Sequence, residues 1–185
     1  MEKTGVQKLA SVLKVLVTIT FICNILALFQ LPTLVVSRGE PGVLMDLLRH
    51  PVAFWLSYYP DFLFLVAECG IYDWVLYGFL FFCGVCTAVI LWQARRVLDT
   101  ILAGNTFTFE NAANLRRAAV CCFLISAAAL GRTVWGLCFY RSLMPLLTYN
   151  ALFVPIFLMA GLLCMVMSAL FRQAAELKAE NDLTI

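Results

Sequence analysis

Four long runs of apolar residues constrain this chain more than any other feature of its sequence. Residues 15–36, 74–93 and 142–171 contain no charged residue, and residues 118–140 contain only Arg132. An α-helix needs about 20 apolar residues to cross the hydrocarbon core of a bilayer. The chain is 63% hydrophobic and 13% charged, whereas soluble domains carry about 25% charged residues. The sequence therefore predicts an all-α, polytopic membrane protein, a bundle of four transmembrane helices.

The limits of these runs predict one transmembrane domain over residues 1–185, with spans at about 13–36, 71–93, 118–140 and 147–171. The third and fourth runs are separated only by Arg141 and a turn near Pro145, which is typical of a tight helical hairpin. The first run exceeds the roughly 7–15 apolar residues of a signal peptide, and no A-x-A-like cleavage site follows it. We therefore expect it to remain as a helix.

The positions of lysine and arginine predict the orientation, because cytoplasmic loops carry an excess of both residues. Of the 13 such residues, nine lie in the N-terminal segment, the second connection and the tail, and three lie in the other two connections. This bias predicts that both termini and the central loop lie in the cytoplasm. The net charge of +2 is too small to indicate direct binding of nucleic acid.

The connection at residues 37–70 is expected to be an extracytoplasmic amphipathic segment. Leu44, Leu47 and Leu48 have helical spacing, and Trp55 and Tyr58 are typical of the membrane–water boundary. These residues predict one or two short amphipathic helices on the outer surface.

The connection at residues 94–117 is expected to form a cytoplasmic loop with a helical extension. Apolar residues at positions 97, 98, 101 and 102 extend the second span beyond the membrane. Gly104 is suited to end this helix, because glycine tolerates the left-handed conformation that closes helices.

The sequence also predicts where the next helix begins. Thr108 is a favourable N-cap, and Glu110 favours the positive end of the helix. Asn111 lies three residues after the cap, where its side-chain carbonyl can return a hydrogen bond to the cap. Phe107, directly before the cap, is placed to pack back on the first turn. We expect this helix to continue without a break into the third span.

The C-terminal tail, residues 172–185, is expected to continue the fourth span as a short amphipathic helix. Phe171, Ala174 and Leu177 share one helical arc, and Glu176 and Glu180 lie opposite. Asn181 is a plausible end. Two roles stay open and are compatible: the tail packs on the central loop of the same chain, or the two together form a docking face.

Arg132 is the one charge within an apolar run, and it has two interpretations. A charge inside a membrane helix is costly and usually faces the bundle interior or water. If the third helix ends near Trp135, Arg132 snorkels to the outer surface. Alternatively it forms an interior ion pair with Glu68 or Asp73.

The sequence contains few residues suited to catalysis or to metal binding. The spacing of Cys83 and Cys86 matches the C-x-x-C redox motif, but the pair lies in mid-span, where a thiolate is poorly stabilised. His50 is the only histidine, which argues against a zinc site and against a Ser-His-Asp triad. We therefore expect no catalytic residue, no metal and no cofactor, and most of the cysteines to be packing residues.

Two polar segments, GNTFTFENAANLRR at residues 104–117 and FRQAAELKAENDLTI at residues 171–185, resemble the bacterial integral membrane family DUF2975, a domain of unknown function. The family pattern in the central loop is G-x-P-F followed by E-N and L-R, and the tail pattern ends in E-N-D-L-T-(V/I). Thr106 departs from it, because the family often has proline there. The residues that fit the loop pattern are Gly104, Phe107, Glu110, Asn111, Leu115 and Arg116. Those that fit the tail pattern are Phe171, Arg172, Leu177, Glu180, Asn181, Asp182, Leu183, Thr184 and Ile185.

The resemblance supplies no reaction. Members often look like genomic neighbours of small helix-turn-helix regulators, which implies a membrane partner that holds or modulates a transcription factor. The matching residues, from Gly104 to Asp182, are thus candidates for a cytoplasmic docking or clasp site. Arg116 or Arg172 can pair with Glu180 or Asp182 to fold the tail on the loop.

Three functions follow as hypotheses. The first is a non-enzymatic regulator or scaffold in the lipid bilayer that docks a soluble partner, such as a helix-turn-helix transcription factor. The second is a small transporter, channel or immunity-type protein acting on a peptide or lipid. The third, less favoured, is a thiol oxidoreductase using Cys83 and Cys86. The sequence leaves the oligomeric state open.

Overall fold

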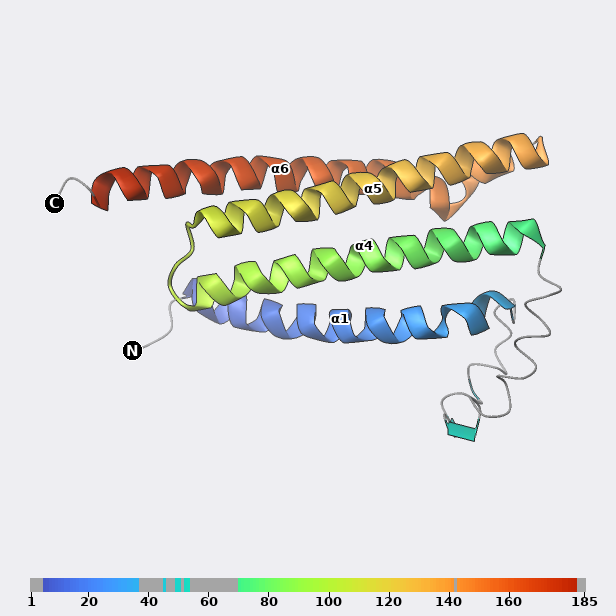
Figure 1. Cartoon of the computed structure of the whole chain (residues 1–185), viewed down its shortest axis with the longest axis horizontal. Coiled ribbons are helices and arrows are strands. Elements are labelled where there is room, and N and C mark those ends of the chain that lie inside the picture. The colour runs from blue at the N-terminus through green and yellow to red at the C-terminus, as the bar shows by residue number, and fades with distance from the viewer. Residues whose placement is uncertain are drawn as a thin grey trace. The chain divides into compact units, whose positions relative to one another are not determined.

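The computed structural model describes residues 5–36, 45, 49–50, 52–53, 70–141 and 143–182, and its regular structure in these ranges is helical (Figure 1). Four helices are long and apolar enough to cross a membrane, which confirms the predicted fold class of a multi-pass membrane protein. In chain order the elements are α1 (Gly5–Val36), α4 (Ile71–Leu102), α5 (Phe109–Tyr140), the 3-10 helix η1 (Met144–Leu147) and α6 (Tyr149–Asp182).

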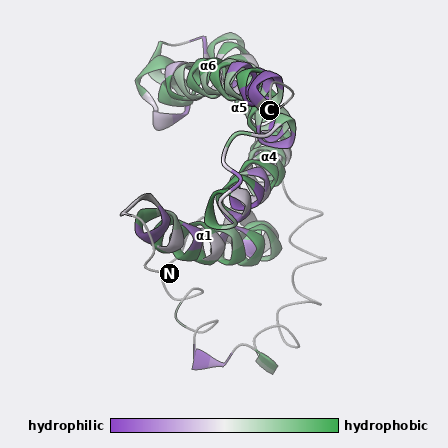
Figure 2. Ribbon diagram, turned by 90° about the vertical axis from the view of Figure 1, so that its left-hand side faces the viewer, coloured by the Kyte–Doolittle hydropathy of each residue, from purple (hydrophilic) through white to green (hydrophobic). Residues whose placement is uncertain are grey.

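The length of the helices exceeds what the bilayer requires. Each has 32 to 34 residues, which gives a length of about 48 Å or more at 1.5 Å per residue, against about 30 Å of hydrocarbon. The apolar runs form helices because lipid offers no hydrogen-bond partner to the backbone. Hydrophobic residues dominate the ribbons of all four helices, and the end of α6 is polar (Figure 2).

The described residues belong to two compact units, one drawn from Met1–Ile25 and Cys83–Ile185 and the other from Leu26–Phe82. In the first unit, Lys14 of α1 pairs with Asp99 of α4 at 2.6 Å, and Phe21 lies 6.0 Å from Trp92 between ring centroids. In the second unit, the Asp73 carboxylate accepts a hydrogen bond from the Gly70 N–H at 3.3 Å. This contact caps the first turn of α4.

Helices α5 and α6 lie side by side and run antiparallel (Figure 1). Of the most apolar stretch of α5, 39% is buried, compared with 6% for α6 and 0% for α1, so α5 is the best-covered helix. Small residues allow close approach of membrane helices, and the clearest case is Gly161 of α6. A Cβ atom added there would lie 2.7 Å from the Phe123 ring of α5.

Two hydrogen bonds from serine hydroxyls to main-chain carbonyls also join α5 and α6. Ser126 Oγ donates to the Val154 carbonyl oxygen at 2.9 Å, and Ser168 Oγ donates to the Ala112 carbonyl oxygen at 2.7 Å. One lies toward the middle of α5 and the other at the end of its first turn, so together they fix the register of the pair.

The predicted turn between the third and fourth spans is confirmed. Helix α5 ends at Tyr140, and the C-cap residue Arg141, with a φ of 47°, closes it in the left-handed conformation. Pro145 lies in η1. A Cβ on Gly136 would come within 3.3 Å of Pro145, so the absence of a side chain there lets the turn fold back against α5.

The predicted outer-surface helices lie largely outside the described residues. Of the connection at residues 37–70, the structure describes Met45, Arg49, His50, Val52, Ala53 and Gly70. The amphipathic character of that connection therefore stays a prediction.

We predict that Gly161→Ala lowers the free energy of unfolding by about 1–3 kcal/mol relative to Gly131→Ala, because the new methyl group overpacks the Phe123 ring. Gly131 is the matched control, since it lies in α5 and a Cβ there meets nothing within 4 Å. The measurement is unfolding of the purified protein in detergent, followed by circular dichroism. Equal stability of the two variants would show that α5 and α6 do not approach closely at Gly161.

Candidate functional site where the central loop meets the tail

Helix α4 is closed where the sequence predicted, at Gly104, and the connection to α5 follows it. Gly104 has a φ of 82°. The Gly104 N–H donates to the Ile101 carbonyl at 3.1 Å, and the Asn105 N–H donates to the Thr100 carbonyl at 3.0 Å. This pair of bonds is the Schellman motif, which turns the chain sharply away from α4.

The start of α5 is also as predicted. Thr108 has extended backbone angles, and its hydroxyl accepts a hydrogen bond from the Asn111 N–H at 3.2 Å. Glu110 lies in the first turn, and its carboxylate is 2.9 Å from the Arg96 guanidinium of α4. Both side chains are about half exposed, so this ion pair contributes little to stability.

The side chain of Asn111 differs from the prediction that it returns to the cap. Its Nδ2 donates to the Thr100 hydroxyl of α4 at 2.6 Å and to the Thr106 carbonyl of the loop at 2.8 Å. Asn111 is fully buried, and a buried amide is stable only when its N–H groups are bonded. The Thr100 hydroxyl of α4 and the Thr106 carbonyl of the loop accept its two N–H groups, and these bonds tie α4, the loop and α5 together.

An aromatic contact joins the central loop to the tail. The rings of Phe107 and Phe171 are 5.5 Å apart between centroids, inclined at 59°, which is a favourable arrangement for aromatic pairs. We expected Phe107 to pack back on the first turn of α5, but this contact reaches across to α6. The loop and tail segments, 64 residues apart in sequence at these positions, are therefore neighbours in space.

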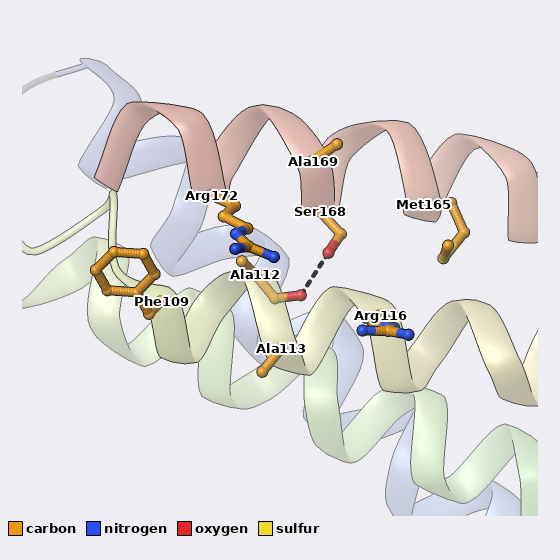
Figure 3. Close-up of a pocket in the computed structure, with 8 residues that line it drawn as sticks. All are labelled: Phe109, Ala112, Ala113, Arg116, Met165, Ser168, Ala169 and Arg172. Carbon is orange, nitrogen blue, oxygen red and sulfur yellow. Dashed lines mark hydrogen bonds between the residues drawn. The ribbon is translucent and has the colours of Figure 1, made fainter. Parts of the chain in front are cut away.

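A groove lies beside this contact, between α5 and α6 (Figure 3). It has a volume of about 440 Å³. Arg116 of α5 and Arg172 of α6 are its two charged residues. The Arg172 Nε is 2.9 Å from a carboxylate oxygen of Glu176, one turn further along the same helix. That ion pair does not itself join the tail to the loop, and the expected pairing of Arg116 with the tail stays a prediction.

The tail is helical to Asp182, one residue beyond the end expected at Asn181. Ala175 is 5% exposed, whereas Leu177 is 62% exposed. The apolar arc predicted from Phe171 to Leu177 is therefore only partly covered, and the tail leaves an apolar side chain uncovered beyond the Phe107–Phe171 contact.

A second buried amide, Asn114, was not predicted from the sequence. The available signal was a polar residue next to two alanines within a helix. Asn114 is 0% exposed, and neither its Oδ1 nor its Nδ2 has a hydrogen-bond partner among the described residues. The Oε1 of Gln93 is likewise buried and has no hydrogen-bond partner among the described residues. Buried amides of this kind usually bond ordered water.

At the far end of α5, Arg132 is half-buried and donates to the Asn150 side-chain oxygen of α6 at 3.4 Å. Asn150 in turn donates to the Thr133 hydroxyl at 3.1 Å. Of the acidic partners that we considered, Glu68 lies outside the described residues, and Asp73 belongs to the other unit. The ion pair therefore stays a prediction.

The described cysteines are all free thiols, including Cys83 and Cys86. Both are buried within α4, at 8% and 6% exposure, so soluble reductants and oxidants do not reach them directly. Among the described residues, no group of three His, Cys, Asp or Glu side chains is arranged to hold a metal ion.

The model of a family described as "Protein of unknown function (DUF2975)" matches residues 58–185, which is more than half of the chain and includes both polar segments. No curated protein matches significantly, and no solved structure does.

We predict that Asn111→Ala lowers the free energy of unfolding by about 1–3 kcal/mol, because it leaves the Thr106 carbonyl and the Thr100 hydroxyl without their buried partner. Asn105→Ala is the matched control, since Asn105 lies exposed in the same loop and its loss should change stability by less than about 0.5 kcal/mol. Thermal unfolding in detergent distinguishes the two. A neutral Asn111→Ala would contradict the assigned role of this amide.

Proposed function

Because the chain belongs to the DUF2975 family, whose function is unknown, we propose its role from the contact between loop and tail. It is a bacterial inner-membrane protein that acts as a regulator or scaffold and catalyses no reaction. Its central loop and tail lie in the cytoplasm and dock a soluble partner, such as a helix-turn-helix transcription factor.

The observation that carries this proposal is the contact of Phe107 with Phe171. It brings together the polar segments at residues 104–117 and 171–185, which would otherwise extend from the membrane helices without contact. Phe107 stays 48% exposed and Leu177 62% exposed. Exposed aromatic and aliphatic side chains on a polar helical surface are typical of protein interaction sites. We define the docking surface as Phe107 and Leu177.

The cytoplasmic placement is supported by the distribution of lysine and arginine. Of the nine residues on the proposed cytoplasmic side, four lie in the central loop, at Arg95, Arg96, Arg116 and Arg117. The partner's face should be apolar at its centre, to cover Leu177.

We predict that Leu177→Glu abolishes retention of the soluble partner, because a charge would have to be buried in the interface. The protein is purified from its native host in mild detergent, and co-purifying soluble proteins are identified by mass spectrometry. Ala179→Glu is the matched control, since Ala179 is exposed on the opposite face of the same helix.

Loss of an identified helix-turn-helix protein with Leu177→Glu, but not with Ala179→Glu, supports the proposal. Retention of that protein by both variants would overturn the assignment of the docking surface. If the wild-type chain retains no soluble protein at all, the tail acts as a clasp within the chain and the docking proposal is wrong.

We also predict that a green fluorescent protein fused after Ile185 fluoresces in intact cells, because the positive-inside rule places the C-terminus in the cytoplasm. Such a fusion folds to its fluorescent form in the cytoplasm and not after export through the general secretory route. An alkaline phosphatase fused at the same place should correspondingly be inactive. The reverse pair of results would contradict the orientation and, with it, the docking proposal.

The network of Arg132, Asn150 and Thr133 favours a second candidate, a small transporter, channel or immunity-type protein. These side chains place one charge and two polar groups between α5 and α6 at the proposed outer end. Polar residues inside membrane bundles often mark substrate pathways. Protection of cells against an external peptide that is lost on Asn150→Leu would support this candidate.

A further inference from the structure

The groove between α5 and α6 exists because its floor is made of small side chains. Ala112 of α5 lies opposite Ser168 of α6, and the Ser168–Ala112 hydrogen bond crosses between the two helices (Figure 3). Ala113 and Ala169 also line the groove. Larger residues at these positions would fill the space of about 440 Å³. Ala113 and Ala169 are exposed, so the groove opens to its surroundings.

Two arginines flank this floor. Arg172 reaches from α6 over Ala112 on one side of the Ser168–Ala112 hydrogen bond, and Arg116 rises from α5 on the other side (Figure 3). Side chains on a helix lean toward its N-terminus. Because α5 and α6 are antiparallel, Arg116 and Arg172 lean toward one another along the groove.

The ion pair of Arg172 leaves N–H groups of its guanidinium for a ligand. Arg172 uses its Nε for the pair with Glu176, in which both side chains are substantially exposed, so the pair is weak. The terminal nitrogens of its guanidinium extend beyond that contact. A guanidinium offers five N–H donors in a geometry that matches phosphate oxygens.

The groove lies where the apolar part of the two helices ends. The uncharged runs begin after Arg117 in α5 and end before Arg172 in α6, so the arginines lie at the level of the lipid headgroups. Toward the middle of the helices, the groove continues into exposed apolar side chains of α6, namely Met165, Leu162 and Leu158, at 39%, 54% and 45% exposure. Their spacing of i, i+4 and i+7 forms one continuous stripe.

We propose that this groove binds an anionic phospholipid. The phosphate oxygens accept hydrogen bonds from Arg116 and Arg172 above the alanine floor, and one acyl chain lies along the stripe from Met165 to Leu158. Basic pockets between membrane helices bind anionic lipid headgroups in this way. A free phosphate would satisfy the arginines and leave the stripe unused, and an acidic peptide would be excluded from the apolar end of the groove. Lipid binding in this groove is independent of the docking of a soluble partner.

The test uses the full-length protein in nanodiscs made from equal amounts of phosphatidylglycerol and phosphatidylcholine. Native mass spectrometry measures the lipid that stays bound to the released protein. We expect phosphatidylglycerol to be retained in preference to phosphatidylcholine, and Arg116→Gln to lower the bound phosphatidylglycerol about fivefold. Arg117→Gln is the matched control, because it removes the same charge one residue away, outside the groove.

A second pair of variants tests the shape of the groove without changing its charge. Ala113→Leu should fill it and lower the retained phosphatidylglycerol, whereas Ala127→Leu, at an exposed position further along α5, should not. Equal retention of the two lipids by the wild-type protein would overturn the proposal. So would equal losses with Arg116→Gln and Arg117→Gln, or displacement of the lipid by inorganic phosphate or by an acidic peptide.

Discussion

The hydrogen bond from Ser168 to the Ala112 carbonyl fixes the register on which the rest of the α5–α6 pair depends. At 2.7 Å it sets Ala112 level with Ser168. A shift of α6 by one turn, about 5.4 Å, would separate Phe107 from Phe171 and move Arg172 away from the groove. Lipid tails provide no hydrophobic force between helices, so packing and hydrogen bonds of this kind hold the pair together.

The same small residues that allow this bond shape the pair along its length. Gly161 admits the Phe123 ring and Gly136 admits Pro145, so the helices approach closely near their middle and at the hairpin turn. Near the loop end, alanines leave an open groove instead, because no large side chain enters it. Small side chains therefore produce both the close packing at Gly161 and Gly136 and the open groove near the loop.

Several independent contacts restrain the central loop. The Schellman bonds at Gly104, the Thr108 cap and the Asn111 amide each restrain it, and the Phe107–Phe171 contact attaches it to the tail. A fully buried Asn111 cannot touch a partner protein, so its role lies in the fold. Exposed residues such as Leu177 remain available for recognition.

The sequence by itself determined the four helices, the hairpin turn at Pro145, the end of α4 at Gly104 and the cap at Thr108, because each follows from local rules of backbone chemistry and from the length of an apolar run. It also indicated the loop and the tail as the candidate site. Only the tertiary structure decided that Asn111 bonds Thr100, that Phe107 meets Phe171 and that Arg116 and Arg172 share a groove. These contacts join residues that are distant in sequence, and they depend on the register between the helices. Side-chain packing between helices sets that register, and no local sequence pattern encodes it.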